Sequence, residues 1–293
     1  MTNAKPLVTV DARGCLFSVV GDQESMPATF LASIRKAKAM ELLLIGGGVK
    51  GFKPEHSALM KPWILEGLKG FVGVAFSGGT AYYDKETGTL KSDIVTSIPA
   101  YLAAENECVA IGTFPRVAEW AFDRDHGHMY TDAYGAVVDN RYHHIAAVQR
   151  NASDVLDWDG DMERRFTVVD ALSDWTKAYL IINGGAVTRD AEIYAAIAKG
   201  IPVIVAEGSF READALVAAL AGDWTLTAAE ERAKAGDDKA KIAKVDAIVT
   251  KCKGILKGKE GLVNVVKYGD SAALTATAKK LGLLGGEGCG CAD

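Results

Sequence analysis

The stretch that decides the fold runs from Ala178 to Leu220 and reads AYLIINGGAVTRDAEIYAAIAKGIPVIVAEGSFREADALVAAL. It begins with a short apolar run, typical of a strand that is covered on both faces. The run stops at Asn183-Gly184-Gly185, where glycine permits a sharp backbone turn. Apolar residues at helical spacing follow, and the order of strand, turn and helix then repeats through Glu207-Gly208-Ser209. Repeated units of this kind predict a mostly parallel sheet with helices on both faces.

Similar turns follow other apolar runs, at Gly46 to Gly48, Ser77 to Thr80 and Thr113 to Arg116. Each loop glycine costs backbone entropy, so packing alone rarely explains so many. Ligands of parallel sheets bind outside the carboxyl ends of the strands, and a helix N-terminus there favours an anion such as phosphate. The sequence therefore predicts a Rossmann-like, doubly wound α/β domain with a phosphate-binding edge.

Ser209 and Arg211 give the last turn of the opening stretch two interpretations. Ser209 can cap the following helix or donate to a phosphate oxygen, whereas Arg211 in the first helical turn has the wrong sign for the helix dipole. A counter-charge could come from Glu207, Asp214 or a ligand phosphate. An ordinary cap with a solvated arginine is the competing interpretation, and the loop by itself does not decide between the two.

Composition excludes several classes of protein. The chain of 293 residues is 49% hydrophobic and 24% charged, which is enough for one large domain with a sizeable core. Its net charge of −5 and isoelectric point near 5.6 argue against nucleic acid or an anionic membrane as a partner. The apolar runs are too short to span a bilayer and the N-terminus lacks the order of a signal peptide. With an odd number of cysteines, five, and no framework spacing, a cytoplasmic protein is expected.

Four segments are expected along the chain. These are an N-terminal β-hairpin (1–25), the Rossmann-like domain (26–222), a C-terminal helical extension (223–284) and a flexible tail (285–293) that holds Cys289 and Cys291. The extension contains an amphipathic helix with one apolar face, formed by Ile242, Val245, Val249, Cys252 and Leu256. This face packs either on the sheet or on a partner, so residues 238–258 are a candidate surface for a homo-oligomer or an effector protein.

A polar and aromatic stretch from 118 to 134 reads as a surface excursion. It holds Asp123, Asp125, His126 and His128, which could be taken for a metal cluster. Alternating histidines in an exposed loop are more often bystanders, so no metal site is expected.

Six ordered motifs together carry a resemblance to a known family. The main one is NGGAVTRDAEIYAAIAKGIPVIVAEGSFREAD, and the others lie at 43–52, 77–80, 111–112, 139–144 and 262–280. With these motifs the chain resembles, over about residues 40 to 280, the cytosolic N-terminal region of melastatin-type transient receptor potential channels. It also resembles the stand-alone prokaryotic relatives of that region, within the SLOG superfamily of Rossmann-like domains. Phe210 replaces a glycine usual in the family, and Asn183 stands where the channels often carry Glu.

The resemblance implies a sensor that binds a nucleotide-derived ligand such as ADP-ribose or its cyclic form, with no further cofactor. Arg211 would hold the diphosphate as a bidentate fork, and Arg164 or Arg165 is a candidate for a second positive contact. The implied pocket consists of Gly46, Gly47, Gly48, Ser77, Gly78, Gly79, Thr80, Arg116, His144, Gly184, Gly185, Glu207, Gly208, Ser209 and Arg211.

A catalytic interpretation stays open beside the sensor. SLOG relatives include phosphoribohydrolases, which cleave the N-glycosidic bond of nucleotides with a Thr and a Glu behind the Gly-Gly turn. Thr188 and Glu192 are the candidates, with Asp190 as a nearer substitute for the glutamate. Their spacing is one residue too long, and one residue rotates a helical position by about 100°. A solvated Glu192 on a non-catalytic sensor is therefore favoured here, and a scaffold that has lost its ligand, at which Phe210 hints, is the third interpretation.

Overall fold

The computed structural model describes residues 8–10, 16–20, 28–84, 89–91, 94–115, 121–123, 128–130, 136–139, 141–148 and 158–285. Within these residues, nine strands form one sheet, in which β1 pairs antiparallel with β2 and every later neighbour pairs parallel. The order across the sheet is β1 (Val8–Val10), β2 (Leu16–Val20), β11 (His144–Val148), β7 (Val109–Pro115), β4 (Val74–Ser77), β3 (Glu41–Gly47), β12 (Thr176–Ile182), β13 (Val203–Glu207) and β14 (Val263–Lys267). The Rossmann-like α/β prediction is confirmed.

The chain reverses its direction across the sheet between β3 and β12. From β3 it proceeds outward through β4, β7 and β11, and then it returns to the other side of β3 and proceeds through β12, β13 and β14. Such a switch point leaves a crevice at the carboxyl ends of the two central strands. The register pairs Gly46 with Ile181 and Gly47 with Ile182, so the turn after β3 lies beside the turn after β12.

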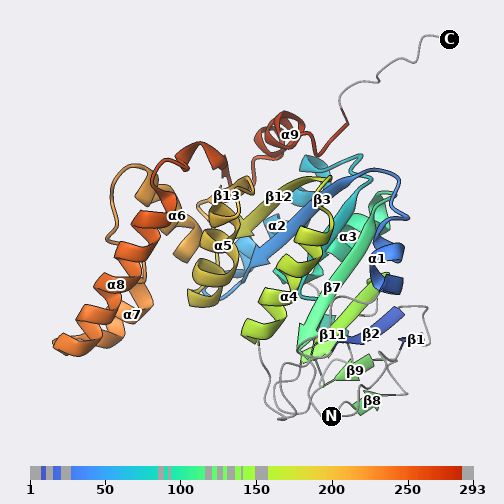
Figure 1. Cartoon of the computed structure of the whole chain (residues 1–293), viewed down its shortest axis with the longest axis horizontal. Coiled ribbons are helices and arrows are strands. Elements are labelled where there is room, and N and C mark those ends of the chain that lie inside the picture. The colour runs from blue at the N-terminus through green and yellow to red at the C-terminus, as the bar shows by residue number, and fades with distance from the viewer. Residues whose placement is uncertain are drawn as a thin grey trace.

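Helices cover both faces of the sheet because successive strand residues point to opposite sides. Leu42 and Leu44 face one core, which α1 (Ala28–Ile34), α4 (Trp158–Ala171), α5 (Tyr194–Ala198), α6 (Arg211–Leu220) and α8 (Lys239–Leu256) cover. Leu43 and Ile45 face the other core, under α2 (Pro54–Gly67), α3 (Ile98–Glu105) and α9 (Ser271–Lys280). Figure 1 shows the two helical layers and the sheet between them. No helix in the described ranges has the length and apolar character needed to cross a bilayer.

Both ends of the chain contribute to the sheet. The expected N-terminal hairpin is present as β1 and β2, and β2 joins the main sheet beside β11. The segment 223–284, expected as a helical extension, also supplies the edge strand β14 and the helix α9, which packs on α2. Between them lie α7 (Ala229–Ala235) and α8. On α8, which packs on α5 and α7, the apolar face is buried except for Ile242, whereas contact of this segment with a partner stays a prediction.

A second sheet lies beside the first. Within the described residues it has five antiparallel strands, in the order β6 (Thr89–Lys91), β5 (Thr80–Asp84), β10 (Ala136–Val138), β9 (His128–Tyr130) and β8 (Ala121–Asp123). Two of these strands fall in the stretch that the sequence reads as a surface excursion, where strands of three residues are too short to show an alternating pattern. No group of three potential metal ligands occurs among the described residues, and Asp125 and His126 lie outside them.

Candidate functional site

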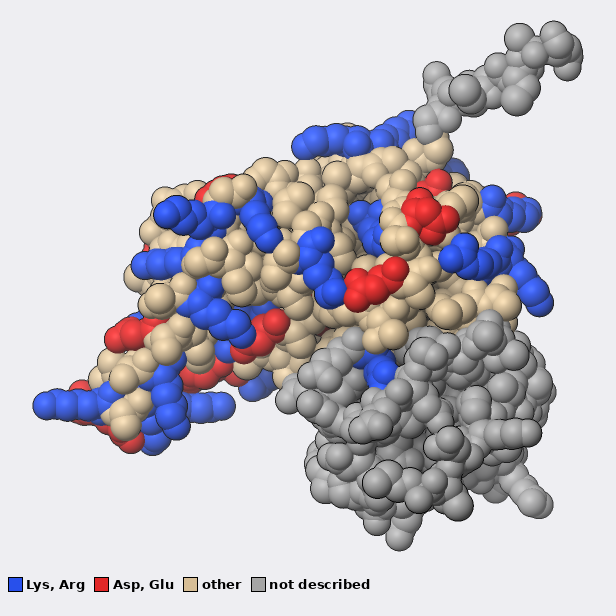
Figure 2. All heavy atoms as spheres, in the orientation of Figure 1, with Lys and Arg blue, Asp and Glu red and all other residues tan. Residues whose placement is uncertain are grey.

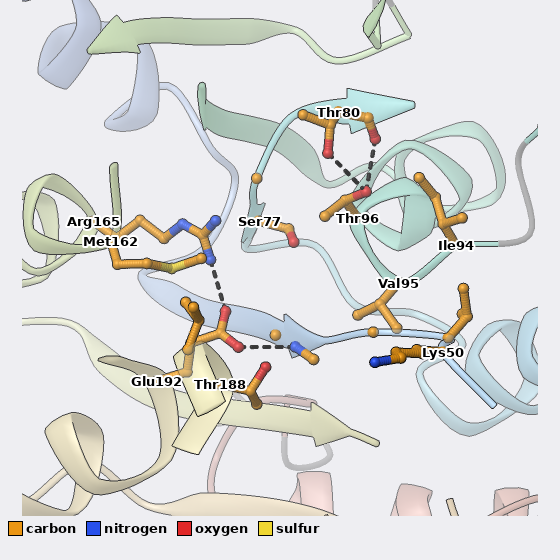
Figure 3. A pocket seen from close by; sticks show the side chains of 16 residues that line it. Lys50, Ser77, Thr80, Ile94, Val95, Thr96, Met162, Arg165, Thr188 and Glu192 are labelled. Carbon is orange, nitrogen blue, oxygen red and sulfur yellow. Dashed lines mark hydrogen bonds and ion pairs between the residues drawn. The ribbon is translucent and has the colours of Figure 1, made fainter. Parts of the chain in front are cut away.

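A cavity of about 490 Å³ opens at the switch point, beside the carboxyl ends of β3 and β4. We call it the central cavity. Its wall comes from the turns after these strands, from residues 94–96, which precede α3, from α4 and from the helix after β12 (Figure 3). The lining residues are Gly46, Gly47, Gly48, Val49, Lys50, Ser77, Gly78, Thr80, Ile94, Val95, Thr96, Met162, Arg165, Val187, Thr188 and Glu192.

Two glycines of the first turn are required by close approach. A Cβ on Gly47, whose φ is +116°, would lie 1.9 Å from the carbonyl oxygen of Ile182. A Cβ on Gly46 would lie 2.5 Å from the carboxyl group of Glu192. The glycines therefore let two backbone turns and one carboxylate meet at the end of β3.

Glu192 is the central polar group of this wall. The residue is only 2% exposed, and both of its carboxylate oxygens accept hydrogen bonds. Oε1 accepts hydrogen bonds from Nη1 of Arg165 and from the Tyr179 hydroxyl, both at 3.0 Å, and Oε2 accepts one from the Gly47 N–H at 2.9 Å. In Figure 3, Arg165 and Glu192 point toward each other across the floor of the cavity. Burial raises the pKa of Glu192, and the Arg165 charge and the hydrogen bonds from Thr188, Tyr179 and Gly47 only partly offset this.

The position of Glu192 corrects the sequence analysis. Residues Thr188–Ile193 form a π-helix, η2, which continues into α5. A π-turn closes over one more residue than an α-turn, so it absorbs the extra residue between Thr188 and Glu192. Both side chains therefore line the central cavity, and the expectation of a solvated Glu192 aimed elsewhere is wrong. Asp190, the substitute candidate, lines neither this cavity nor its neighbour and instead pairs with Nη2 of Arg189 at 2.8 Å.

Of the two neighbouring arginines proposed for a second positive contact, Arg165 is the one that lines the central cavity. Its side chain is buried, and its Nε donates to the Thr113 hydroxyl at 3.2 Å while Nη1 reaches Glu192. The charge thus lies in the cavity wall, on the middle of α4. Arg164 is half-buried and is not one of the lining residues of the two cavities.

The turn after β4 contributes three of its four predicted residues. Ser77, Gly78 and Thr80 line the central cavity. The Ser77 hydroxyl donates to the Ile45 carbonyl at 2.7 Å, and the hydroxyls of Thr80 and Thr96 lie 3.1 Å apart. The side chains of Ser77 and Thr80 are therefore held by hydrogen bonds within the domain. Gly79, with φ +61°, packs toward Gly112 and Ile145 instead of the cavity.

A second cavity of about 220 Å³ adjoins the first, and we call it the outer cavity. Lys50 lines both, and the chain from Gly185 to Val187 passes from one to the other. Its wall consists of Lys50, Gly51, Gly185, Ala186, Arg211, Glu212, Leu226, Ala229, Glu230 and Glu231. Gly185 and Arg211 are therefore together, as predicted, but beside the outer cavity. A Cβ on Gly185 would lie 2.8 Å from Nη2 of Arg211, so this glycine makes room for the guanidinium.

In the turn after β13, the Ser209 hydroxyl and two backbone N–H groups form hydrogen bonds with other groups of the chain. The buried Ser209 hydroxyl donates to the Ala206 carbonyl at 2.6 Å and accepts from the Asn183 N–H at 2.7 Å. The carboxylate of Asp214 accepts from the N–H groups of Gly208 and Phe210, at 2.7 and 3.1 Å. The N-cap residue of α6 is Phe210, without a side-chain cap, so the ordinary Ser209 cap that was the competing interpretation of this loop is not found. Glu207, Gly208 and Ser209 line neither cavity.

The counter-charge of Arg211 is a residue that the sequence analysis did not consider. Nη2 of Arg211 lies 2.7 Å from Oε1 of Glu230, a residue of α7, whereas Glu207 and Asp214 were the candidates. Lys50 contacts the same oxygen at 3.3 Å. Because Glu230 is remote in sequence, only a placement of α7 over the sheet edge could have indicated the contact.

Two further predicted residues lie elsewhere, and a third is not described. Gly184, with φ +100°, packs against Thr188 and lines neither cavity. His144 is the first residue of β11 and also lies outside both linings. Burial, with the nearby charges of His143 and Lys36, lowers its pKa to about 4. Arg116 falls outside the described residues.

One of the comparisons with known proteins matches a family model over part of the chain. Residues 129–249 match the family model described as SLOG in TRPM, prokaryote. That range includes α4, the π-helix, Arg211 and α7. A structure of the molybdenum cofactor carrier protein MCP from Chlamydomonas reinhardtii is 14% identical, covers 83% of this chain and 98% of its own, and superposes with a TM-score of 0.40. A comparison with curated proteins finds no match.

Proposed function

Over residues 129–249 the chain belongs to the family described as SLOG in TRPM, prokaryote, and from this premise we propose that it binds a nucleotide-derived ligand across the two adjoining cavities. ADP-ribose and cyclic ADP-ribose are the ligands of first choice. The proposal includes the role of a sensor, in which binding and not turnover carries the function.

The observation that carries the proposal is the position and shape of the central cavity. It lies at the switch point of a doubly wound sheet, where such folds bind their ligands, and its volume falls in the range of small-molecule sites. Val49, Ile94, Val95, Met162 and Val187 give it an apolar wall suited to a base or ribose ring. Glu192 and Thr80 add polar groups that fix orientation.

The outer cavity supplies the positive charge that a diphosphate needs. Arg211 and Lys50 line it, and Lys50 also lines the central cavity, so a ligand that fills the larger space extends its phosphates toward both cations. Arginine contacts a phosphate through two parallel N–H donors, which lysine cannot reproduce. Arg211 is therefore the proposed diphosphate fork.

The test is a titration of ADP-ribose, cyclic ADP-ribose, NAD, ADP and AMP into the wild type and into Arg211→Ala, by calorimetry. We expect at least one diphosphate ligand to bind, and the variant to lose about tenfold or more in affinity for it. Arg232→Ala is the matched control, because it removes an exposed arginine from α7. If no ligand binds, or if Arg211→Ala binds all of them as the wild type does, the proposal fails.

A second candidate function, hydrolysis of a nucleotide N-glycosidic bond, is favoured by Glu192. A buried carboxyl group in the wall of the central cavity, held by Arg165, is suited to stabilise the positive charge that develops on a ribose as its bond to the base breaks. Mass spectrometry of each ligand after long incubation distinguishes the two functions. Free base and ribose phosphate, lost in Glu192→Gln but retained in the control Asp190→Asn, would establish hydrolysis. A ligand recovered intact supports the sensor.

A further inference from the structure

The outer cavity already contains an anion supplied by the chain. One oxygen of the Glu230 carboxylate lies 2.7 Å from Arg211 Nη2 and 3.3 Å from Lys50 Nζ. The three residues come from the start of α6, from the turn after β3 and from α7. An arginine and a lysine that converge on a single oxygen form the arrangement that binds a phosphate oxygen. We infer that Glu230 occupies a phosphate subsite of this protein, and that a diphosphate displaces it and detaches α7 from the sheet edge.

The contact that would be broken is a weak one. The side chains of Arg211 and Glu230 are 21% and 42% exposed, and that of Lys50 is 75% exposed. Solvent screens such pairs strongly, so they add little to stability. A diphosphate carries more negative charge than one carboxylate and offers more acceptor oxygens, which favours it at the two cations, whereas Glu212 and Glu231 in the same wall oppose it.

The backbone around the subsite is strained on both sides. Phe210 and Arg211 have φ values of +73° and +55°, and Ala228, which precedes α7, has φ +57°. Side chains other than glycine rarely adopt this region, and it persists only where the surroundings impose it.

Helix α7 has few other attachments to the domain. Of its seven residues only Ala235 is buried, and Leu226, which leads into the helix, is 47% exposed. Among the described residues, α7 is also held by the ion pair of Glu231 with Arg189, at 2.8 Å, by the buried Thr227 and Ala228 that precede it, and by its packing on α8. Figure 2 shows charged side chains of both signs over the end of the molecule formed by α7 and α8. Two ion pairs thus contribute to holding α7, and a charged ligand can replace the one between Glu230 and Arg211.

The inference rests on the proposed function for the identity of the natural ligand, but inorganic pyrophosphate tests it without a nucleotide. The experiment measures pyrophosphate binding by calorimetry in metal-free buffer for the wild type, Glu230→Gln and Glu230→Gln with Arg211→Ala. Asp237→Asn, which removes an exposed charge just beyond α7, is the matched control.

We expect Glu230→Gln to bind pyrophosphate about three- to tenfold more tightly than the wild type, because the internal competitor is gone. Asp237→Asn should bind as the wild type does, and the added Arg211→Ala should abolish the gain. Hydrogen exchange adds a structural readout. Pyrophosphate should speed the exchange of residues 229–235 in the wild type, whereas Glu230→Gln should show the faster exchange without any ligand.

Unchanged affinity in Glu230→Gln, or slower exchange of α7 on binding, would overturn the inference. The outcome is separable from that of the proposed function. If pyrophosphate behaves as expected while no nucleotide-derived ligand binds, the subsite stands and the proposed ligand class fails. If ADP-ribose binds but Glu230→Gln alters neither its affinity nor that of pyrophosphate, the function stands and the displacement fails.

Discussion

The two cavities each contain an arginine–carboxylate pair, and the pairs differ in burial. Arg165 and Glu192 are each 3% exposed, and Tyr179 and the Gly47 N–H also donate hydrogen bonds to Glu192. Arg211 and Glu230 are much more exposed and join the domain to a short helix. A buried pair cannot be opened without leaving an uncompensated charge in the protein interior, whereas water readily replaces the partners of an exposed pair. The first pair therefore suits a fixed site wall and the second a replaceable contact.

The largest expected effect comes from breaking the buried pair. Arg165→Met leaves the Glu192 carboxylate without its cation, and should lower the free energy of unfolding by about 3–5 kcal/mol. Glu230→Gln, which breaks the exposed pair, should change it by less than about 0.5 kcal/mol. Urea unfolding at neutral pH measures both.

A double variant sharpens the result for the buried pair. Arg165→Met with Glu192→Leu removes both charges, so it should recover much of the stability that Arg165→Met loses. Equal losses in Arg165→Met and Glu230→Gln would show that the difference in burial has no energetic consequence.

The next effect concerns Glu212, which lies at the boundary of the two regions. It is buried beside Arg189 and lines the outer cavity, and burial raises its pKa from 4.5 to about 7, with the Arg189 charge opposing the shift. When folding raises the pKa of a carboxyl group, the contribution of that group to the free energy of unfolding is largest below its ordinary pKa. The contribution is lost as the pH rises through the pKa of the folded state. Between pH 4.5 and 7 the loss amounts to about 3 kcal/mol.

The variant Glu212→Gln has no such titration. Its stability relative to the wild type should therefore increase as the pH rises from 4.5 to 7, and thermal unfolding across that range measures the difference. A difference that is constant with pH would mean that Glu212 titrates in the folded protein as it does in the unfolded chain.

The smallest of the three effects tests how the turn after β3 holds Glu192. Gly46→Ala places a Cβ at 2.5 Å from the carboxyl group, so the carboxylate must shift and weaken its bond to Gly47. We expect a loss of about 1–3 kcal/mol. Gly48→Ala is the control, because nothing lies within 4 Å of its Cβ position. Thermal unfolding of both variants is the measurement, and equal behaviour would contradict the close packing of Glu192 on this turn.

The fold followed from the sequence because its signals are local. Apolar runs such as Leu42 to Ile45 and the glycine turns behind them define a parallel strand by themselves, and their repetition defines the doubly wound order. The short strands β8 and β9 gave no such signal. Their pairing depends on partners elsewhere in the chain, so a pattern within three residues could not reveal them.

The site was only partly predictable, for two physical reasons. The residues at strand ends, Gly46 to Gly48 and Ser77 to Thr80, were placed by the topology, and most of them line the central cavity. The direction of the Glu192 side chain could not be predicted, because it depends on a change of helix type that side-chain spacing does not reveal. The partner of Arg211 was missed because Glu230 reaches it through tertiary packing, and sequence proximity favoured Glu207 and Asp214.

Helix α7 is joined to α6 and α8 at its two ends, and this has a consequence for the proposed displacement of Glu230 by a diphosphate. It follows α6, which packs on β13, and precedes α8, whose Cys252 and Leu256 are buried in the core under the same face. A detached α7 therefore stays close to Arg211, and Glu230 competes at an effective concentration set by the length of the tether. Under the proposed displacement, the diphosphate concentration at which half of the molecules release α7 is therefore set within each molecule. It does not depend on the protein concentration.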